Sequence, residues 1–160
     1  MTRRKFIAGT SATATAIGTV GSARSKAEGK RPAKAQSSKR KVTATGAPKP
    51  AGPYSQAIVA GNTIYVAGQG PYDPVTGKMP DSFEEQAGRV FENIKAIVEA
   101  AGATMANVVK VNVYLADLAN FQKMNDVYRR YFSDPYPVRA TVGTQLLGGM
   151  GIEVECIAVK

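Results

Sequence analysis

The chain has 160 residues, with 21 lysines and arginines, 12 aspartates and glutamates, no histidine and a single cysteine, Cys156. The absence of histidine excludes Ser-His-Asp and Cys-His triads, and together with the single cysteine it excludes zinc sites built on histidine or cysteine and any intramolecular disulfide. Residues 1–50 carry 12 basic residues and 1 acid whereas residues 51–160 carry 9 basic residues and 11 acids, which argues against a nucleic-acid-binding surface on the folded part.

The first 23 residues have the order of an export signal. Thr2-Arg3-Arg4-Lys5-Phe6-Ile7 resembles the twin-arginine motif, residues 6–23 are uncharged, and Gly21-Ser22-Ala23 is typical of a cleavage site. The uncharged stretch has few large apolar side chains, so it does not predict a membrane anchor. We therefore expect a twin-arginine signal over 1–23, a disordered basic linker over 24–46, and a periplasmic or extracellular protein.

The predicted domain, residues 47–160, begins with two short strands. Ser55–Val59 and Thr63–Ala67 are rich in apolar and β-branched residues. Gly61-Asn62 between them is a turn signal, so the two runs predict a β-hairpin.

A well-marked helix follows this hairpin. Ser82 and Glu85 have the spacing of a capping box, and Gly102 is placed to end the helix. Apolar residues between them recur with helical spacing and form one stripe, which predicts a helix packed against a core. The stripe comprises Phe83, Ala87, Val90, Phe91, Ile94, Ile97, Val98 and Ala101.

The second half of the domain repeats the alternation of strand and helix. Val109, Val111, Val113 and Leu115 alternate with polar residues and predict a strand. Asn120 can cap a second helix, whose apolar stripe is Phe121, Met124, Val127, Tyr128 and Tyr131. The element order is β-β-(β)-α-β-α-β-β, which predicts an α/β (α+β) two-layer sandwich with two helices on one face of a mixed sheet.

The C-terminal part contains two alternating runs, Arg139–Leu146 and Ile152–Val159. The glycine-rich break Gly148-Gly149-Met150-Gly151 between them favours a hairpin of two half-buried strands. Cys156 lies in the second run without a basic neighbour in sequence, so a buried structural thiol is expected rather than a nucleophile.

Three charges stand out in these two runs. Arg139 opens the first run, and Glu153 and Glu155 share one face of the second. A guanidinium or a carboxylate on a buried strand costs free energy unless a partner compensates it. The charges therefore form a structural ion pair, lie on an exposed sheet face, or belong to a functional site.

Seven separated motifs occur in the order typical of one family. They are Gly52-Pro53-Tyr54-Ser55-Gln56-Ala57, Val66-Ala67-Gly68-Gln69, Asp73-Pro74-x-Thr76-Gly77, Asn93-Ile94-Lys95-Ala96-Ile97-Val98-Glu99-Ala100-Ala101-Gly102, Asn125-x-x-Tyr128-x-x-Tyr131-Phe132, Pro137-x-Arg139-x-Thr141-Val142 and Ile152-Glu153-Val154-Glu155-x-Ile157-Ala158. With them, residues 44–160 resemble the RidA (YjgF-type) deaminases, which hydrolyse 2-imino and 2-enamino acids to 2-oxo acids and ammonia. The resemblance implies a chorismate-mutase-like fold, a homotrimer, and ligand sites in clefts between subunits.

The resemblance also implies roles for individual residues. Arg139 would hold the substrate carboxylate and Glu153 would position the attacking water, in a pocket lined by Tyr54, Gly68, Asn125 and Thr141. A planar guanidinium binds a carboxylate through two hydrogen bonds. An imine carbon is already electrophilic, so this hydrolysis requires neither metal nor cofactor. The implied activity is that of a 2-iminobutanoate/2-iminopropanoate deaminase-type hydrolase acting on a small 2-imino acid.

Two departures from the family pattern bear on the substrate. Ala67 stands where deaminating members usually carry serine, and Leu146-Leu147-Gly148 stands where Arg-Leu-Pro is usual. A non-catalytic module that binds a small carboxylate through Arg139 therefore remains an alternative to the deaminase. Structural explanations also exist for the four pocket residues. Tyr54 could pack at a subunit edge and Gly68 could serve the backbone conformation, while Asn125 could be solvated on a helix face and Thr141 could be an ordinary strand residue.

The predicted C-terminal hairpin carries a consequence for the site. It places Arg139 opposite Val159, so Glu153 lies six residues along the strand from that partner, about 20 Å away at 3.3 Å per residue. One small ligand could not touch both side chains within a chain. We therefore expect the two to meet between neighbouring subunits.

Overall fold

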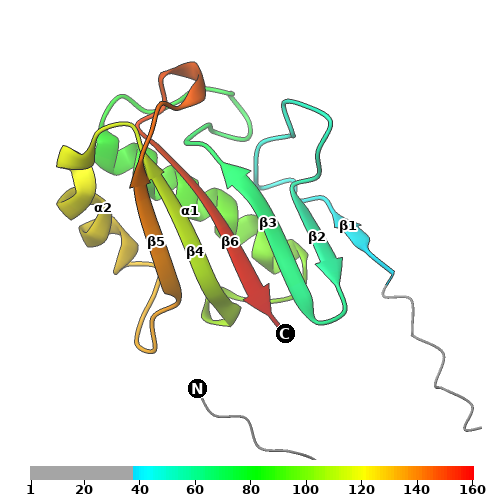
Figure 1. The fold of residues 1–160 in the computed structure, drawn as a ribbon. Coiled ribbons are helices and arrows are strands. Elements are labelled where there is room, and N and C mark those ends of the chain that lie inside the picture. The colour runs from blue at the N-terminus through cyan, green and yellow to red at the C-terminus, as the bar shows by residue number, and fades with distance from the viewer. Residues whose placement is uncertain (1–37) are drawn as a thin grey trace, which may run out of the picture. The chain divides into compact units, whose positions relative to one another are not determined.

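The computed structural model describes residues 38–160, and the predicted signal and the linker up to residue 37 lie outside the described residues. Within this range the chain forms six strands and two α-helices (Figure 1). The strands are β1 (Arg40–Val42), β2 (Ala57–Ala60), β3 (Thr63–Gln69), β4 (Val108–Leu115), β5 (Val138–Gly143) and β6 (Ile152–Val159), and the helices are α1 (Phe83–Ala100) and α2 (Phe121–Tyr128).

All six strands belong to one sheet of order β1-β2-β3-β6-β4-β5. The pair β4–β5 is parallel and the other neighbours are antiparallel, so the sheet is mixed. Helix α1 packs on one face against β3 and β6, and α2 packs against α1 (Figure 1). The predicted fold class, a mixed sheet with two helices on one face, is confirmed.

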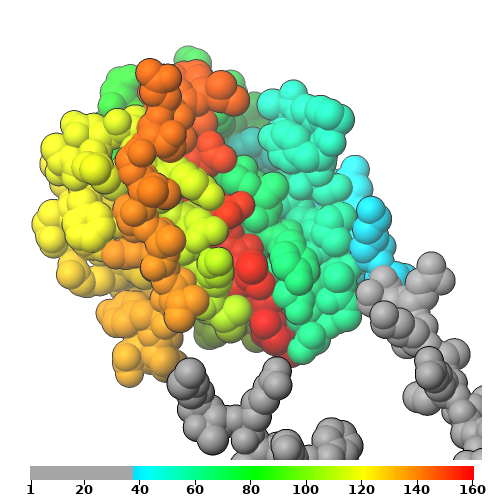
Figure 2. Space-filling view, in the orientation of Figure 1, coloured from blue at the N-terminus to red at the C-terminus, as the bar shows by residue number. Residues whose placement is uncertain are grey.

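The alternation along the strands separates a core face from an open face. On β6, Ile152, Val154, Cys156 and Ala158 are buried under the helices, while the residues between them are half-buried. Figure 2 views the other face, where side chains of β3, β6, β4 and β5 lie at the surface without a helix over them. Cys156 is 3% exposed, as expected of a structural thiol.

Helix α1 is built as the sequence predicts. The hydroxyl of Ser82 accepts a hydrogen bond from the backbone N–H of Glu85 at 3.3 Å and donates one to the Glu85 carboxylate at 2.8 Å. Gly102 follows the helix with a φ of 86°, a left-handed conformation that favours glycine. Six of the eight predicted stripe residues are 0% exposed, namely Ala87, Val90, Phe91, Ile94, Ile97 and Val98.

Helix α2 begins where predicted but is capped differently. Asn120 occupies the N-cap position without a side-chain capping bond, and Asp117 instead caps the preceding turn by accepting a hydrogen bond from Ala119 N at 2.9 Å. Met124 and Val127 are fully buried, whereas Phe121 is half-exposed at the start of the stripe. Within residues 38–160, neither helix has the length and hydropathy needed to cross a membrane.

The predicted hairpin of the two C-terminal runs is wrong. Strand β6 spans Ile152–Val159 as expected, but β4 lies between it and β5 in the sheet. β5 runs parallel to β4, with Arg139 opposite Val111, and β6 runs antiparallel to both β3 and β4. The glycine-rich segment is therefore a connection that passes over the end of β4 rather than a hairpin turn.

Two further differences concern strand boundaries. β1 lies inside the stretch 24–46, for which the composition predicts a linker, and its Val42 is 2% exposed against the core. In β4 the pairing with β6 shifts between Val108 and Lys110, so Val108 is buried and Val109 is exposed. Such a bulge inserts one residue and reverses the faces on its N-terminal side, which strict alternation does not predict.

Candidate active site

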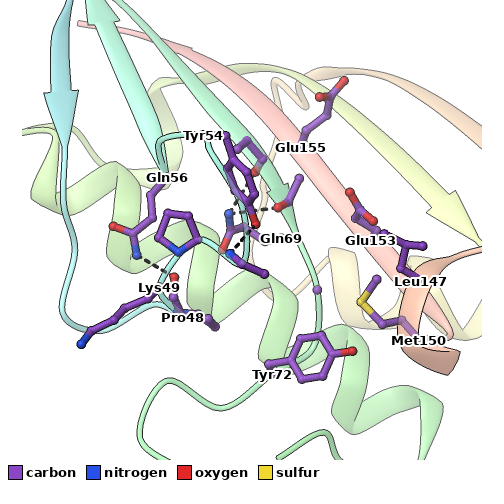
Figure 3. Close-up of a pocket in the computed structure, with 15 residues that line it drawn as sticks. Pro48, Lys49, Tyr54, Gln56, Gln69, Tyr72, Leu147, Met150, Glu153 and Glu155 are labelled. Atoms are coloured by element: carbon purple, nitrogen blue, oxygen red, sulfur yellow. Dashed lines mark hydrogen bonds between the residues drawn. The ribbon is translucent and has the colours of Figure 1, made fainter. Parts of the chain in front are cut away.

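Five of the six predicted site residues line two separate cavities, and Thr141 lines neither. A cavity of about 640 Å³ is bounded by the loop before β2, the end of β3 and the segment that leads into β6 (Figure 3). It contains Tyr54, Gly68 and Glu153. A second cavity of about 370 Å³, between α2 and the start of β5, contains Asn125 and Arg139.

Gly68 is needed for the position of the Glu153 carboxylate. A Cβ atom at residue 68 would overlap the Oε1 atom of Glu153 and lie 3.0 Å from its Cδ atom. The backbone of Gly68 is not in the left-handed region, so conformational freedom is not the reason for glycine here. The missing side chain lets the carboxylate lie against the backbone of β3.

Glu153 and Glu155 share a face but differ in their surroundings. Glu155 accepts hydrogen bonds from Asn112 Nδ2 at 2.7 Å and from the Tyr114 hydroxyl at 3.1 Å. Glu153 has no hydrogen-bond or ion-pair partner among residues 38–160, and partial burial, followed by the nearby charge of Glu155, raises its pKa. Glu153 is therefore the carboxylate that is free to accept a proton at the cavity wall.

Arg139 is held by aromatic rings rather than by an acid. Its guanidinium carbon lies 4.7 Å from the ring centroid of Tyr128 and 5.8 Å from that of Phe121. Its Nη1 atom donates to the Met124 sulfur at 3.8 Å, and no ion pair to Arg139 forms within the described range. Cation–π contacts orient the guanidinium while leaving its hydrogen-bond donors available to a carboxylate.

Polar groups without partners lie around Arg139. Burial raises the pKa of Tyr128 to about 12, against an opposing effect of Arg139, and the Tyr128 hydroxyl has no hydrogen-bond partner among the described residues. The Thr141 hydroxyl is also buried and unpaired there; it lies two residues after Arg139 on the same face but lines neither cavity. Asn125 is half-buried beside the guanidinium.

The two cavities open on opposite faces of the sheet. Arg139 pairs with Val111 and faces the helices, whereas Glu153 pairs with Tyr114 and faces the open side. Glu153 lies in the same row across the sheet as Val142, which is two strands away on β5, and Val142 is three residues from Arg139 along that strand. The Cα atoms of Glu153 and Arg139 are therefore about 14 Å apart. The hairpin register that predicted this separation is wrong, but a single small ligand still cannot contact both side chains of one chain.

The sequence did not identify the apolar wall of the larger cavity. Tyr72, Leu147 and Met150 line it beyond Glu153 (Figure 3). Glycines make room for this wall, because a Cβ at Gly70 would overlap the Met150 sulfur and one at Gly148 would overlap the Tyr72 hydroxyl. The only signal in the sequence was the glycine-rich segment around Met150, which was interpreted as a hairpin turn.

Buried amides fix the loops that carry the cavity. Asn93 Nδ2 donates to the carbonyls of Gly70 at 3.1 Å and Tyr72 at 3.0 Å. Gln56 accepts a hydrogen bond from Ala44 N at 2.8 Å and donates to three carbonyls of the segment 44–48. Both side chains are almost fully buried, so the larger cavity has a rigid frame.

Comparison with known proteins assigns the chain to a family. The family described as Endoribonuclease L-PSP matches residues 44–160. The chain belongs to this family. The L-PSP family comprises the RidA (YjgF-type) proteins indicated by the motifs, so that resemblance is confirmed, whereas the twin-arginine signal stays a prediction.

Individual L-PSP relatives match most of this chain. A RutC family protein of Pyrococcus abyssi is 55% identical over 116 residues, which cover 71% of this chain and 91% of that protein. A 2-iminobutanoate/2-iminopropanoate deaminase of Dermatophagoides farinae is 42% identical over 125 residues, which cover 77% of this chain and 98% of that protein. The crystal structure of RidA from the Antarctic bacterium Psychrobacter sp. is 44% identical with a TM-score of 0.74, covering 76% of this chain and 99% of that one.

Proposed function

We propose that this L-PSP protein is a hydrolytic deaminase that converts 2-imino and 2-enamino acids to 2-oxo acids and ammonia. The support comes from relatives named imine deaminases and from one observation in the structure. The chain offers an unpaired guanidinium, Arg139, and an unpaired carboxylate with a raised pKa, Glu153, each at a cavity. Cleavage of RNA has no comparable support, because residues 51–160 carry more acids than bases and no histidine.

In the proposed reaction, Arg139 binds the substrate carboxylate through two charge-assisted hydrogen bonds. Glu153 accepts a proton from water as the water oxygen bonds to the carbon of the protonated imine and the carbon–nitrogen π electrons move to the nitrogen, which gives a neutral carbinolamine. Glu153 then returns the proton to the nitrogen, the carbon–nitrogen bond breaks as the carbonyl forms, and the hydroxyl proton passes to the departing ammonia, which leaves as ammonium. Tyr54, Gly68, Asn125 and Thr141 keep their proposed roles as pocket residues around this centre.

We propose that the site is completed between subunits of a homotrimer. Arg139 and Glu153 lie on opposite faces of the sheet in one chain, so two chains are needed to bring them to one ligand. The open sheet face also exposes apolar side chains: Tyr65 is 50% exposed, Val142 51% and Val138 68%. Such a patch on an uncovered sheet is typical of an interface. A monomer in light scattering at micromolar concentration would contradict this proposal.

Turnover of a freshly generated imino acid tests the activity. The wild type should accelerate release of ammonia and 2-oxo acid, and Glu153→Gln should keep its affinity for pyruvate while losing turnover. Arg139→Ala should lose about 30- to 1000-fold in pyruvate affinity, corresponding to about 2–4 kcal/mol, and Arg139→Lys should recover only part of it. Pyruvate binding without any turnover would instead identify a carboxylate-binding module. Unchanged pyruvate affinity in Arg139→Ala would show that Arg139 is structural.

A further inference from the structure

We propose that the larger cavity selects 2-imino acids with a bulky apolar side chain, of the kind formed from leucine or methionine, over those with a methyl or ethyl group. This inference rests on the proposed function and concerns the specificity of the same site. It comes from the distribution of polar and apolar groups along the cavity wall, which Figure 3 displays.

The cavity is polar at one end and apolar at the other. Figure 3 shows Glu155 at one end and Tyr72 at the opposite end, with Glu153 between them and Leu147 and Met150 on the side toward Tyr72. A substrate whose imine carbon lies at Glu153 therefore has carboxylates on one side and a tyrosine ring, a thioether and an isobutyl group on the other. An apolar side chain is therefore stabilised toward Tyr72 rather than toward Glu155.

Most other polar groups on the wall are already engaged within the protein. The oxygen and the nitrogen of the Gln56 amide both form hydrogen bonds with the backbone of the segment 44–48. The Gln69 amide nitrogen donates to the carbonyls of Ala67 and Gly68, and the Tyr54 hydroxyl accepts a hydrogen bond from Ala51 N at 3.2 Å. Ala67 contributes only a methyl group. Tyr54 keeps its hydroxyl hydrogen and Gln69 its amide oxygen for a ligand, whereas Lys49 extends away from Glu153 (Figure 3), so few hydrogen-bonding groups on this part of the wall face a ligand at Glu153.

Leu147 provides the adjustable part of the apolar wall. It is 85% exposed at the cavity mouth, on a turn where Gly148 and Gly149 have φ values of 65° and 74°. Met150, by contrast, is 7% exposed and is fixed against Gly70. An exposed leucine beside a ligand cavity can cover an apolar side chain, and its replacement does not disturb the core.

The size of the preference follows from the apolar surface that is buried. Each methylene group transferred from water is worth about 0.8 kcal/mol, or roughly a 4-fold change in kcat/KM. The leucine-derived imine has three more carbons than the alanine-derived imine, so the preference can reach about 60-fold. The glutamate-derived imine should be disfavoured, because its second carboxylate meets the apolar wall or the like charges of Glu153 and Glu155, while Lys49 extends away from Glu153 (Figure 3).

The test compares kcat/KM for imines generated freshly from alanine, leucine, methionine and glutamate. The wild type should have a kcat/KM at least about 10-fold higher for the leucine- and methionine-derived imines than for the alanine-derived imine. Leu147→Asn should lower the ratio of kcat/KM for the leucine-derived imine to kcat/KM for the alanine-derived imine by about 4- to 10-fold. Val75→Asn is the matched control, since Val75 is 90% exposed and lies outside the cavity, and it should leave the ratio unchanged.

Binding of 2-oxo acids gives a readout that does not depend on turnover. 4-Methyl-2-oxopentanoate should bind more tightly than pyruvate in the wild type, and Leu147→Asn should reduce this difference. A kcat/KM for the alanine-derived imine equal to or higher than that for the leucine-derived imine would overturn the proposed specificity while leaving the proposed deaminase activity intact. A ratio unaffected by Leu147→Asn would also overturn it. Absence of turnover with every imine would refute the deaminase, and the oxo-acid series would then decide the specificity of the pocket alone.

Discussion

Replacing Gly68 by alanine should displace the Glu153 carboxylate without unfolding the protein. The added Cβ would overlap Oε1 of Glu153 and lie 3.0 Å from its Cδ. Glu153 has no hydrogen-bond partner within residues 38–160, so its side chain can rotate away at little cost. Replacing a glycine also reduces the entropy of the unfolded chain, which offsets about 0.4–1 kcal/mol. We expect the free energy of unfolding to change by less than about 1 kcal/mol.

The effect on catalysis should be much larger than the effect on stability. The carboxylate must move by roughly 1 Å or more to restore normal contact distances. Misplacing a catalytic group by this amount costs about 100-fold in rate. Stopped assays of imine hydrolysis should therefore show kcat reduced by about 100-fold, whereas pyruvate affinity, which depends on Arg139, should stay within about 3-fold.

Two further variants make the Gly68 test specific. Gly88→Ala, in the middle of α1 with its nearest atom 3.9 Å from the new Cβ, should stabilise the protein by about 1 kcal/mol and leave kcat unchanged. Gly68→Ala combined with Glu153→Gln should be no slower than Glu153→Gln alone, because both changes remove the same interaction. A folded Gly68→Ala protein with kcat within about 3-fold of the wild type would refute the assigned position of the carboxylate.

The remaining predictions concern pH, a buried hydroxyl and export. Because the pKa of Glu153 is raised in the folded state, ionisation of Glu153 opposes folding, and the free energy of unfolding should fall as the pH rises through that pKa. Over the same pH range kcat/KM should rise, because the ionised carboxylate is the form that accepts a proton. Urea titrations and pH–rate profiles of Glu153→Gln should show neither dependence. Tyr128→Phe should gain about 1 kcal/mol of stability and keep pyruvate affinity, since the lost hydroxyl has no partner in the described chain, and weaker binding would show that the hydroxyl serves the site. Changing Arg3 and Arg4 to lysine should leave the precursor inside the cell in fractionation, and unchanged export would remove the signal assignment.

Local signals predicted the individual elements well. The N-cap at Ser82, the left-handed glycine at residue 102 and the apolar stripe between them are all short-range features, and the structure confirms them. β6 was predicted with the correct bounds for the same reason. Local pattern did not predict which strands pair. Two alternating runs on either side of a glycine-rich break are equally compatible with a hairpin and with an arrangement in which a third strand, here β4, lies between them.

The candidate site shows the same division between local and long-range information. Motif and costly placement together singled out Arg139 and Glu153 as charges that need an explanation. The cation–π support from Tyr128 could not be predicted, since Tyr128 looked like an ordinary core position on a helical stripe. Likewise, the space that Gly68 leaves for Glu153 depends on the neighbouring strand and is not encoded near Gly68 itself.

The central claim is that one active site uses Arg139 of one chain and Glu153 of another. Co-expressing Arg139→Ala and Glu153→Gln chains with different tags and purifying the mixed oligomer tests it directly. In a cyclic trimer that contains both kinds of chain, about one third of the interfaces contain both intact residues, whichever variant is present twice. The claim predicts about one third of the wild-type activity per site from two variants that are each inactive alone. Activity no higher than that of either variant by itself would contradict it.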